Sequence, residues 1–136
     1  MTYENDRQVY DIVRDHLLTQ GVKSGYDNDA TGVFTCLYRG HKDTMCAIGV
    51  LLTDEEAYHG DGGLDHDDET KALSVKDLLC SHAGMRERFK NISTPLLIDL
   101  QDVHDNYPVR SWGDRLEDMG RYLKEDGRYL YQETPG

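Results

Sequence analysis

The chain has 136 residues, of which 38 % are hydrophobic and 30 % are charged, and its formal net charge is −11. This acidity argues against direct binding to a nucleic-acid backbone, because phosphate contacts need a basic surface. No apolar run approaches the ~20 residues that a membrane-spanning helix needs, and the charged start of the chain lacks the apolar stretch of a signal peptide. We therefore expect a single domain over residues 1–136 with a cytoplasmic location.

The first predicted element is a helix over residues 5–20. Its apolar side chains recur at helical spacing, and Gly21 follows where a glycine commonly ends a helix. Residues 22–32 are rich in turn-forming residues and predict a loop. The block 33–39 is rich in β-branched and aromatic residues, which predicts a strand.

The apolar run 45–52 has no clear period, so its pattern alone leaves strand and helix both open. We favour a short pairing strand near residues 44–46 that leads into a helix ending at Leu52. Within this run Gly49 would let another element approach closely.

A helix start is predicted after Thr53, because Glu56 three residues later completes a capping-box pattern. An acidic loop at about residues 59–70 follows, and we expect it to be flexible. The wider stretch from Asp54 to Glu69 holds eight acidic residues and no lysine or arginine. Such a stretch suits a basic partner surface or simply keeps the protein soluble.

Three helices are predicted in the rest of the chain. One runs over residues 74–89, with Ser74 as its cap and Gly84 weakening it or dividing it in two. The next begins at Thr94-Pro95 and is ended by Pro108.

The last helix is predicted to start at the cap Ser111 and to stop at Gly127, and residues 129–131 are predicted to form a terminal strand. The predicted fold class is therefore α+β. Four or five helices would pack on a small antiparallel sheet of two or three strands.

Three cysteines, Cys36, Cys46 and Cys80, form no C-x-x-C pair. We interpret them as reduced thiols that pack as small apolar side chains. A Cys36–Cys46 disulfide stays open if the two residues face each other across a hairpin.

The candidate binding residues are Tyr38 and Arg39, whose side chains would point to opposite faces of a strand. The planar fork of Arg39 suits a phosphate or a carboxylate, and the alternative is an ordinary surface ion pair. Arg110 or Arg115 would supply a further cation. The acidic patch is the second candidate surface, and it consists of Asp61, Asp65, Asp67, Asp68 and Glu69.

Catalytic and metal patterns are weak in this sequence. His66-Asp67 and His104-Asp105 are similar to the dyads of metal phosphohydrolases, but the remaining ligands of such a site cannot be assembled. The acidic loop does not match the spacing of an EF-hand, and no glycine-rich phosphate loop or nucleophile elbow is present. The sequence therefore predicts no metal and no cofactor, and it favours a non-enzymatic role without deciding the question.

The central block resembles small uncharacterised phage and prophage proteins. These share a C-x-Y-R strand followed by C-A-[IV]-G-x-L-x-x-D-E-x-x-Y, which this chain matches at Cys36, Tyr38, Arg39, Cys46, Ala47, Ile48, Gly49, Leu51, Asp54, Glu55 and Tyr58. The group has no established activity, so the resemblance implies a phage accessory product in an infected or lysogenic bacterial cell. It implies no mechanism.

Three functions follow as expectations. The first is a non-enzymatic binder or inhibitor of a host protein with a basic surface. The second is a sponge-type anti-defence protein that binds a nucleotide or another small molecule, for which homo-oligomerisation is expected. The third and weakest is a metal-dependent hydrolase that uses His104, Asp105 and the acidic loop.

Overall fold

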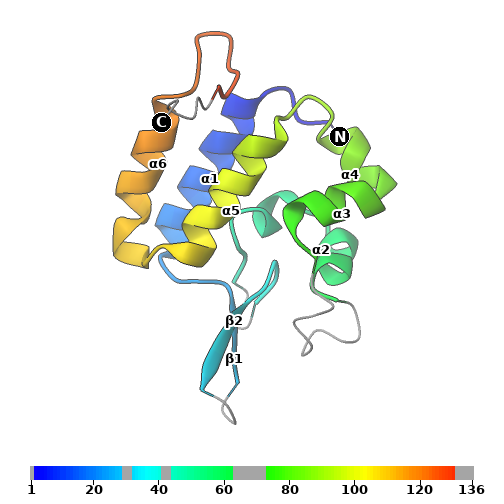
Figure 1. The fold of residues 1–136 in the computed structure, drawn as a ribbon, viewed down its shortest axis with the longest axis vertical. Helices are drawn as coiled ribbons and strands as arrows, with labels where there is room; N and C mark the ends of the chain where they lie inside the picture. Colours follow the sequence, from blue (N-terminus) through cyan, green and yellow to red (C-terminus); the bar gives the residue numbers. More distant parts are fainter. Residues whose placement is uncertain (1, 29–31, 41–43, 63–72, 131–136) are drawn as a thin grey trace, which may run out of the picture.

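The protein is described by a computed structural model, which covers residues 2–28, 32–40, 44–62 and 73–130. Its body consists of helices (Figure 1). Three of them, α1 (Asp6–Gln20), α5 (Thr94–Asn106) and α6 (Trp112–Gly120), pack against one another on one side of the molecule. On the other side lie three short helices, α2 (Asp54–Gly60), α3 (Val75–Ser81) and α4 (Ala83–Arg88).

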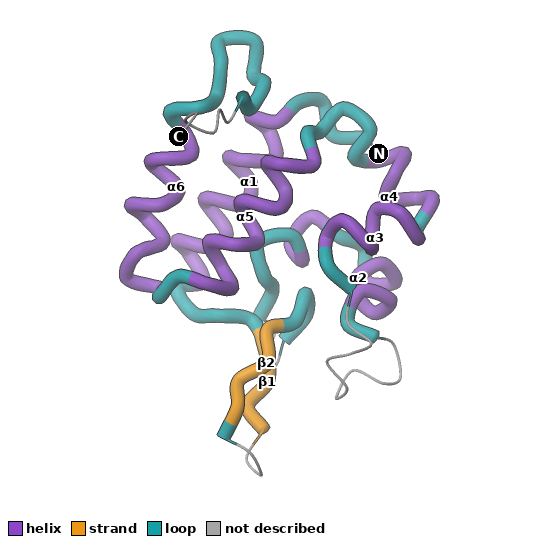
Figure 2. Tube along the Cα trace, viewed as in Figure 1, coloured by secondary structure: helices purple, strands orange, loops and turns teal. Residues whose placement is uncertain are grey.

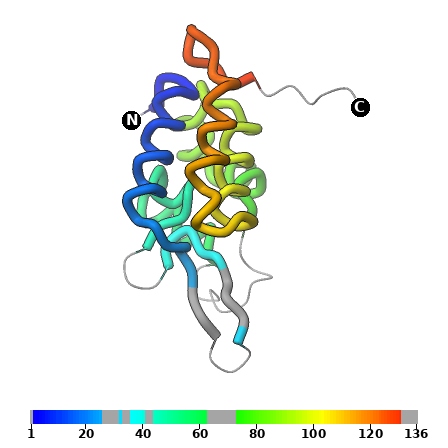
Figure 3. The backbone as a smooth tube through the Cα atoms, turned by 90° about the vertical axis from the view of Figure 1, so that its left-hand side faces the viewer, coloured from blue at the N-terminus to red at the C-terminus, as the bar shows by residue number. Residues whose placement is uncertain are grey.

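The predicted α+β fold is wrong, because the described residues form no sheet on which the helices pack. The described strands are β1 (Gly25–Asn28) and β2 (Val33–Cys36), which pair as one antiparallel hairpin with Gly25 opposite Cys36. This hairpin extends away from the helical body (Figure 2). The helices bury their apolar side chains in one common core instead. In the side view α1 lies beside α6 (Figure 3).

The core is one cluster of buried side chains to which every helix contributes. Its largest fully buried members include Trp112, Leu17, Ile48, Leu78, Leu96 and Leu100. Full burial of a leucine-sized side chain stabilises a fold by roughly 1.5–3 kcal/mol, so this cluster is the main stabilising feature. Among the described residues no helix is both long enough and apolar enough to cross a membrane.

Local signals place four of the helix ends. Gly21 takes the left-handed conformation that ends α1, with φ 66°. Thr53 and Glu56 form the predicted capping box of α2. Ser74 caps α3 as predicted, and α5 carries its proline in the first turn. These predictions are confirmed. They could be made from the sequence because a cap depends only on residues three or four positions apart.

Other boundaries differ from the predictions. The predicted helix 74–89 is divided, but the break lies at His82, whose extended backbone (φ −122°, ψ 106°) separates α3 from α4. The last helix ends at Gly120 and not at Gly127, and Ser111 belongs to a 3-10 turn, η5 (Val109–Ser111), without capping α6 through its side chain.

The strand predictions fail where pairing is not local. Residues 25–28 were predicted as loop, yet they pair with β2. The predicted strand at 44–46 is a single bridge between Arg39 and Met45, and the helix expected up to Leu52 is one 3-10 turn, η2 (Gly49–Leu51). The predicted terminal strand is likewise a single bridge between Leu123 and Tyr129, within the described part of that segment.

Candidate functional site

Arg39 is engaged in the fold. Its Nη1 donates to Asp54 Oδ1 at 2.6 Å, and its Nη2 donates to the Leu52 carbonyl at 2.7 Å. Of the two roles considered for Arg39, anion binding and an ion pair, the structure shows the ion pair. The pair holds the chain after β2 against the first turn of α2.

Tyr38 is 7 % exposed and does not offer an open face for stacking. Its hydroxyl donates to the Leu73 carbonyl at 2.7 Å. Burial, with nearby negative groups, raises the pKa of the phenol far above its ordinary value. The ring therefore serves as a wall of a pocket between α3 and α5.

The four predicted anion-binding residues are not brought together. Arg110 lies exposed in η5, and Arg115 lies in α6, where its guanidinium carbon is 4.6 Å from the centre of the Tyr107 ring. Tyr38 lines the pocket between α3 and α5, and Arg115 lines a different one between α5 and α6. Arg39 and Arg110 line neither of these two pockets.

Asp61 is buried, although it was predicted as part of an acidic patch on the surface. Its two carboxylate oxygens accept hydrogen bonds from the backbone N–H groups of Tyr38, at 2.7 Å, and Arg39, at 3.0 Å. It thereby fixes the end of α2 to the chain after β2. The other members of the patch, Asp65, Asp67, Asp68 and Glu69, lie outside the described residues.

The α3–α5 pocket has a volume of about 400 Å³, within the usual range for small-ligand sites. Its lining combines carboxylates with one ammonium group and several neutral groups. The polar lining residues that matter here are Cys36, Asp61, Lys76, Gln101, Asp102 and Asp105. Three carboxylates against one lysine make the described lining acidic.

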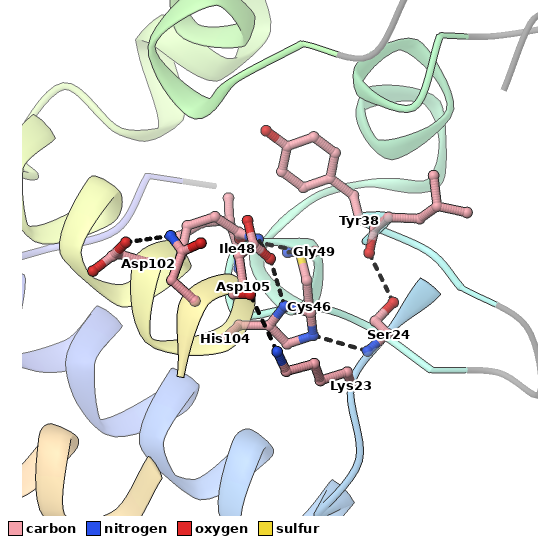
Figure 4. Close-up of polar contacts among 12 residues, drawn as sticks. Lys23, Ser24, Tyr38, Cys46, Ile48, Gly49, Asp102, His104 and Asp105 are labelled. Atoms are coloured by element: carbon pink, nitrogen blue, oxygen red, sulfur yellow. Dashed lines mark hydrogen bonds and ion pairs between the residues drawn. The ribbon is translucent and has the colours of Figure 1, made fainter. Parts of the chain in front are cut away.

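His104 is fully buried and contacts Asp105, a residue of the pocket lining (Figure 4). The backbone N–H of Ser24 donates to its Nε2 at 2.8 Å, so this nitrogen carries no proton. The proton therefore resides on Nδ1, which donates to Asp105 Oδ1 at 2.7 Å. This contact joins adjacent residues of one helix, α5.

Asp105 is the centre of the network around the pocket. Besides the histidine it accepts a hydrogen bond from Gln101 Nε2 at 2.8 Å, and the thiol of Cys36 also bonds to it. The amide oxygen of Gln101 accepts in turn from Cys46 Sγ at 3.1 Å and from the Ile48 N–H at 3.2 Å. Through Gln101 the pocket wall is thus hydrogen-bonded to the segment 46–52.

Cys36, His104 and Asp105 have potential metal-ligating atoms within 4.8 Å of one another. The histidine does not fit this role, because the Ser24 N–H occupies Nε2 and coordination through Nδ1 would need a proton on Nε2. Only a thiolate and a carboxylate remain, fewer than the three protein ligands of a catalytic zinc site. The same hydrogen bond keeps His104 from acting as a general base.

The thiols are not activated. Burial, together with the negative charge of Asp105, raises the pKa of Cys36 to about 11, and burial raises the pKa of Cys46 even further. A raised pKa leaves little thiolate at neutral pH, so nucleophilic catalysis is not favoured. Cys36 and Cys46 are both free thiols, so the disulfide that was left open is not formed.

Sequence reasoning missed a row of aspartates on α5. Asp99, Asp102 and Asp105 recur every three residues, and this helix contains no lysine or arginine. Like charges at such spacing cost roughly 0.2–0.5 kcal/mol per pair in a helix. The D-x-x-D-x-x-D pattern is visible in the sequence, where it follows the denser acidic stretch from Asp54 to Glu69.

The second pocket, the α5–α6 pocket, has a volume of about 590 Å³. Its lining includes Asp99, Asp102, Tyr107, Arg115, Asp118 and Arg121. Asp102 borders both pockets, so the aspartate row of α5 separates them.

Comparisons with protein-family models, with curated proteins and with solved structures found no match to this chain.

Proposed function

We propose that the protein is a non-enzymatic phage accessory protein that binds a basic surface of a host protein in the bacterial cytoplasm. The α3–α5 pocket would hold one lysine or arginine side chain of that partner. The observation that carries the proposal is the acidic lining of this pocket, which contains the carboxylates of Asp61, Asp102 and Asp105 and a single ammonium group, that of Lys76.

The charge of the pocket supports a cationic guest. Asp102 is exposed at the pocket, and its carboxylate accepts a hydrogen bond from Asn106 Nδ2. Opposite charges attract over about 8–10 Å in physiological salt, so a net charge of −11 also favours encounters with basic proteins.

The apolar part of the lining supports a long side chain over a small inorganic cation. Leu37, Leu73, Val75 and Ile98 line the pocket, and Ile98 is 44 % exposed although it is large and apolar. Lysine and arginine pack their methylene stems on such surfaces while their charged ends reach polar groups. A partner side chain of this kind would satisfy both parts of the lining.

The hydrolase alternative gains no support from the geometry. It needs His104 as a ligand or a base, and both ring nitrogens of His104 are occupied by Ser24 and Asp105. The nucleotide alternative loses Tyr38, which is buried, and Arg39, which is paired with Asp54. Its third predicted residue, Arg115, lines the other pocket, apart from Tyr38.

The proposal is tested by capture of host proteins on immobilised variants at about 50 mM and about 150 mM salt, since screening weakens exposed charge pairs. Asp102→Asn removes a charge at the pocket and is expected to weaken capture of a basic partner roughly tenfold. Lys76→Gln removes the competing cation and is expected to strengthen it.

Matched controls separate the pocket from the overall charge. Glu117→Gln and Lys124→Gln change the net charge equally, but both residues are exposed and line neither described pocket. They are expected to change capture little. Absence of a basic partner at either salt concentration, or equal effects of the pocket and control variants, would contradict the proposal.

A further inference from the structure

Apart from Asp102, the residues of the α5–α6 pocket have no part in the proposed function. Its floor contains Val103 and Met119, both buried, and its rim carries charges of both signs. Arg115 and Arg121 lie on the α6 side, and Asp99 and Asp102 lie on α5. An apolar floor with a few polar groups converging on it is the usual construction of a small-molecule site.

The guanidinium group of Arg115 is held in one orientation, but no described carboxylate pairs with its charge. Its guanidinium stacks over the Tyr107 ring at 4.6 Å, a contact that fixes the plane of the group. In the described part of the chain Arg115 makes no ion pair, whereas Arg121 lies 3.5 Å from Asp118. A stacked guanidinium without a carboxylate partner is suited to bidentate binding of a ligand carboxylate.

The opposite wall is suited to a cation. Asp99 is half-buried, and its Oδ2 accepts a hydrogen bond from the Tyr129 hydroxyl at 2.7 Å. Burial raises the pKa of Asp99, the Tyr129 hydroxyl opposes this, and the charge of Asp102 raises the pKa further. A cationic group placed between these two carboxylates would relieve their mutual repulsion.

We infer that the α5–α6 pocket binds a zwitterionic small molecule, an α-amino acid with an apolar or aromatic side chain. Its carboxylate lies on Arg115, its ammonium group lies between Asp99 and Asp102, and its side chain covers Val103 and Met119. Nucleotides are disfavoured because three aspartates in the lining repel phosphate groups. This inference needs no protein partner, and it shares only Asp102 with the α3–α5 pocket.

Three related probes test both ends of the ligand by calorimetry and by amide chemical shifts. L-phenylalanine carries both charges, 3-phenylpropionate lacks the ammonium group, and phenethylamine lacks the carboxylate. We expect L-phenylalanine to bind saturably and to shift amides of α5 and α6. We expect each half-ligand to bind roughly tenfold more weakly, the cost of one charge-assisted contact.

The variant Arg115→Gln should remove the preference for L-phenylalanine over phenethylamine, because it deletes the carboxylate contact only. Arg115→Lys keeps the charge without the planar fork and should restore the preference in part. Arg110→Gln, an exposed arginine outside the pocket, is the control and should bind like the wild type. Arg115 is exposed, so loss of folding is not expected, and thermal melting checks this.

Three results would overturn the inference. Equal binding of 3-phenylpropionate and L-phenylalanine would show that the aspartates contribute nothing. Equal binding of phenethylamine would show the same for Arg115. No saturable shift with any probe up to about 10 mM, where even a millimolar complex is populated, would show that the pocket takes no such ligand.

Discussion

Gly49 is required by the close approach of two backbone segments. A Cβ atom at this position would lie 2.0 Å from the Tyr38 carbonyl oxygen, far inside van der Waals contact. The same carbonyl accepts a hydrogen bond from the Cys46 N–H at 3.2 Å. The close approach predicted at this glycine is confirmed, and the neighbouring segment is the chain after β2.

We predict that Gly49→Ala lowers the free energy of unfolding by about 2–3 kcal/mol, because backbone atoms must move to admit the methyl group. Urea denaturation followed by the fluorescence of the single tryptophan, the buried Trp112, measures this. Gly113→Ala is the matched control in α6, where the nearest atom, Leu18 Cδ2, is 4.0 Å away. It should stabilise by roughly 0.5 kcal/mol. A larger loss in Gly113→Ala than in Gly49→Ala would refute this reading.

At the scale of elements, the short helices are held together by buried charge. Glu56 is 2 % exposed, and its Oε1 accepts from Arg88 of α4 and from the Thr53 N–H. Arg88 also donates to the Leu51 carbonyl. The carboxylate of Glu56 therefore caps α2 and links it to α4. In the chain these two helices precede and follow α3.

The pH dependence of stability should report on this pair. Burial by itself raises the pKa of Glu56, but the Arg88 and Thr53 hydrogen bonds outweigh it, and the net pKa falls below its ordinary value of 4.5. Stability contributed by Glu56 is therefore complete above pH 4.5 and is lost as the pH falls through the folded-state pKa.

We predict that Glu56→Gln costs about 2–3 kcal/mol at pH 7, since it leaves the largely buried Arg88 without its carboxylate. The variant should also lose less stability than the wild type between pH 5 and pH 3, as urea titrations at several pH values would show. Glu55→Gln is the control on the same turn; this residue is exposed, and its effect should stay within about 0.5 kcal/mol. Equal costs of the two substitutions at pH 7 would argue against the buried pair.

For the whole molecule, Asp6 links segments from both ends of the chain. It is 4 % exposed, and its carboxylate accepts from the Ser93 N–H at 2.8 Å, the Ser93 hydroxyl at 3.0 Å and the Tyr129 N–H at 2.8 Å. The start of α1, the start of α5 and the segment after α6 thus meet at one side chain.

We predict that Asp6→Ala lowers the free energy of unfolding by about 3 kcal/mol, because it leaves three polar groups without their acceptor. Hydrogen exchange supplies a local measurement, in which the Tyr129 amide should lose protection more than the amides of α2 and α3. Asp15→Ala, an exposed position of the same helix, should have a small effect on both. Unchanged exchange at Tyr129 in the Asp6→Ala variant would mean that Asp6 does not hold this segment.

Part of the site was readable in the sequence. Tyr38 and Arg115 were singled out, and each lines a pocket, but they line different ones. Asp61 was singled out as a solvated acid and is instead a buried acceptor of backbone hydrogen bonds. Its role depends on a partner segment 22 or 23 residues away, which no local pattern encodes.

The amino-acid sequence by itself determined where α1 ends and where α2, α3 and α5 begin. The cap at Thr53, the glycine at Gly21 and the proline at the start of α5 act over three or four residues, so their effect is visible in the chain. Only the tertiary structure decided that residues 25–28 pair with β2 and that His104 receives the Ser24 N–H, 80 residues away. These contacts follow from packing of the whole core, because their stabilisation depends on which distant groups burial brings within hydrogen-bond distance.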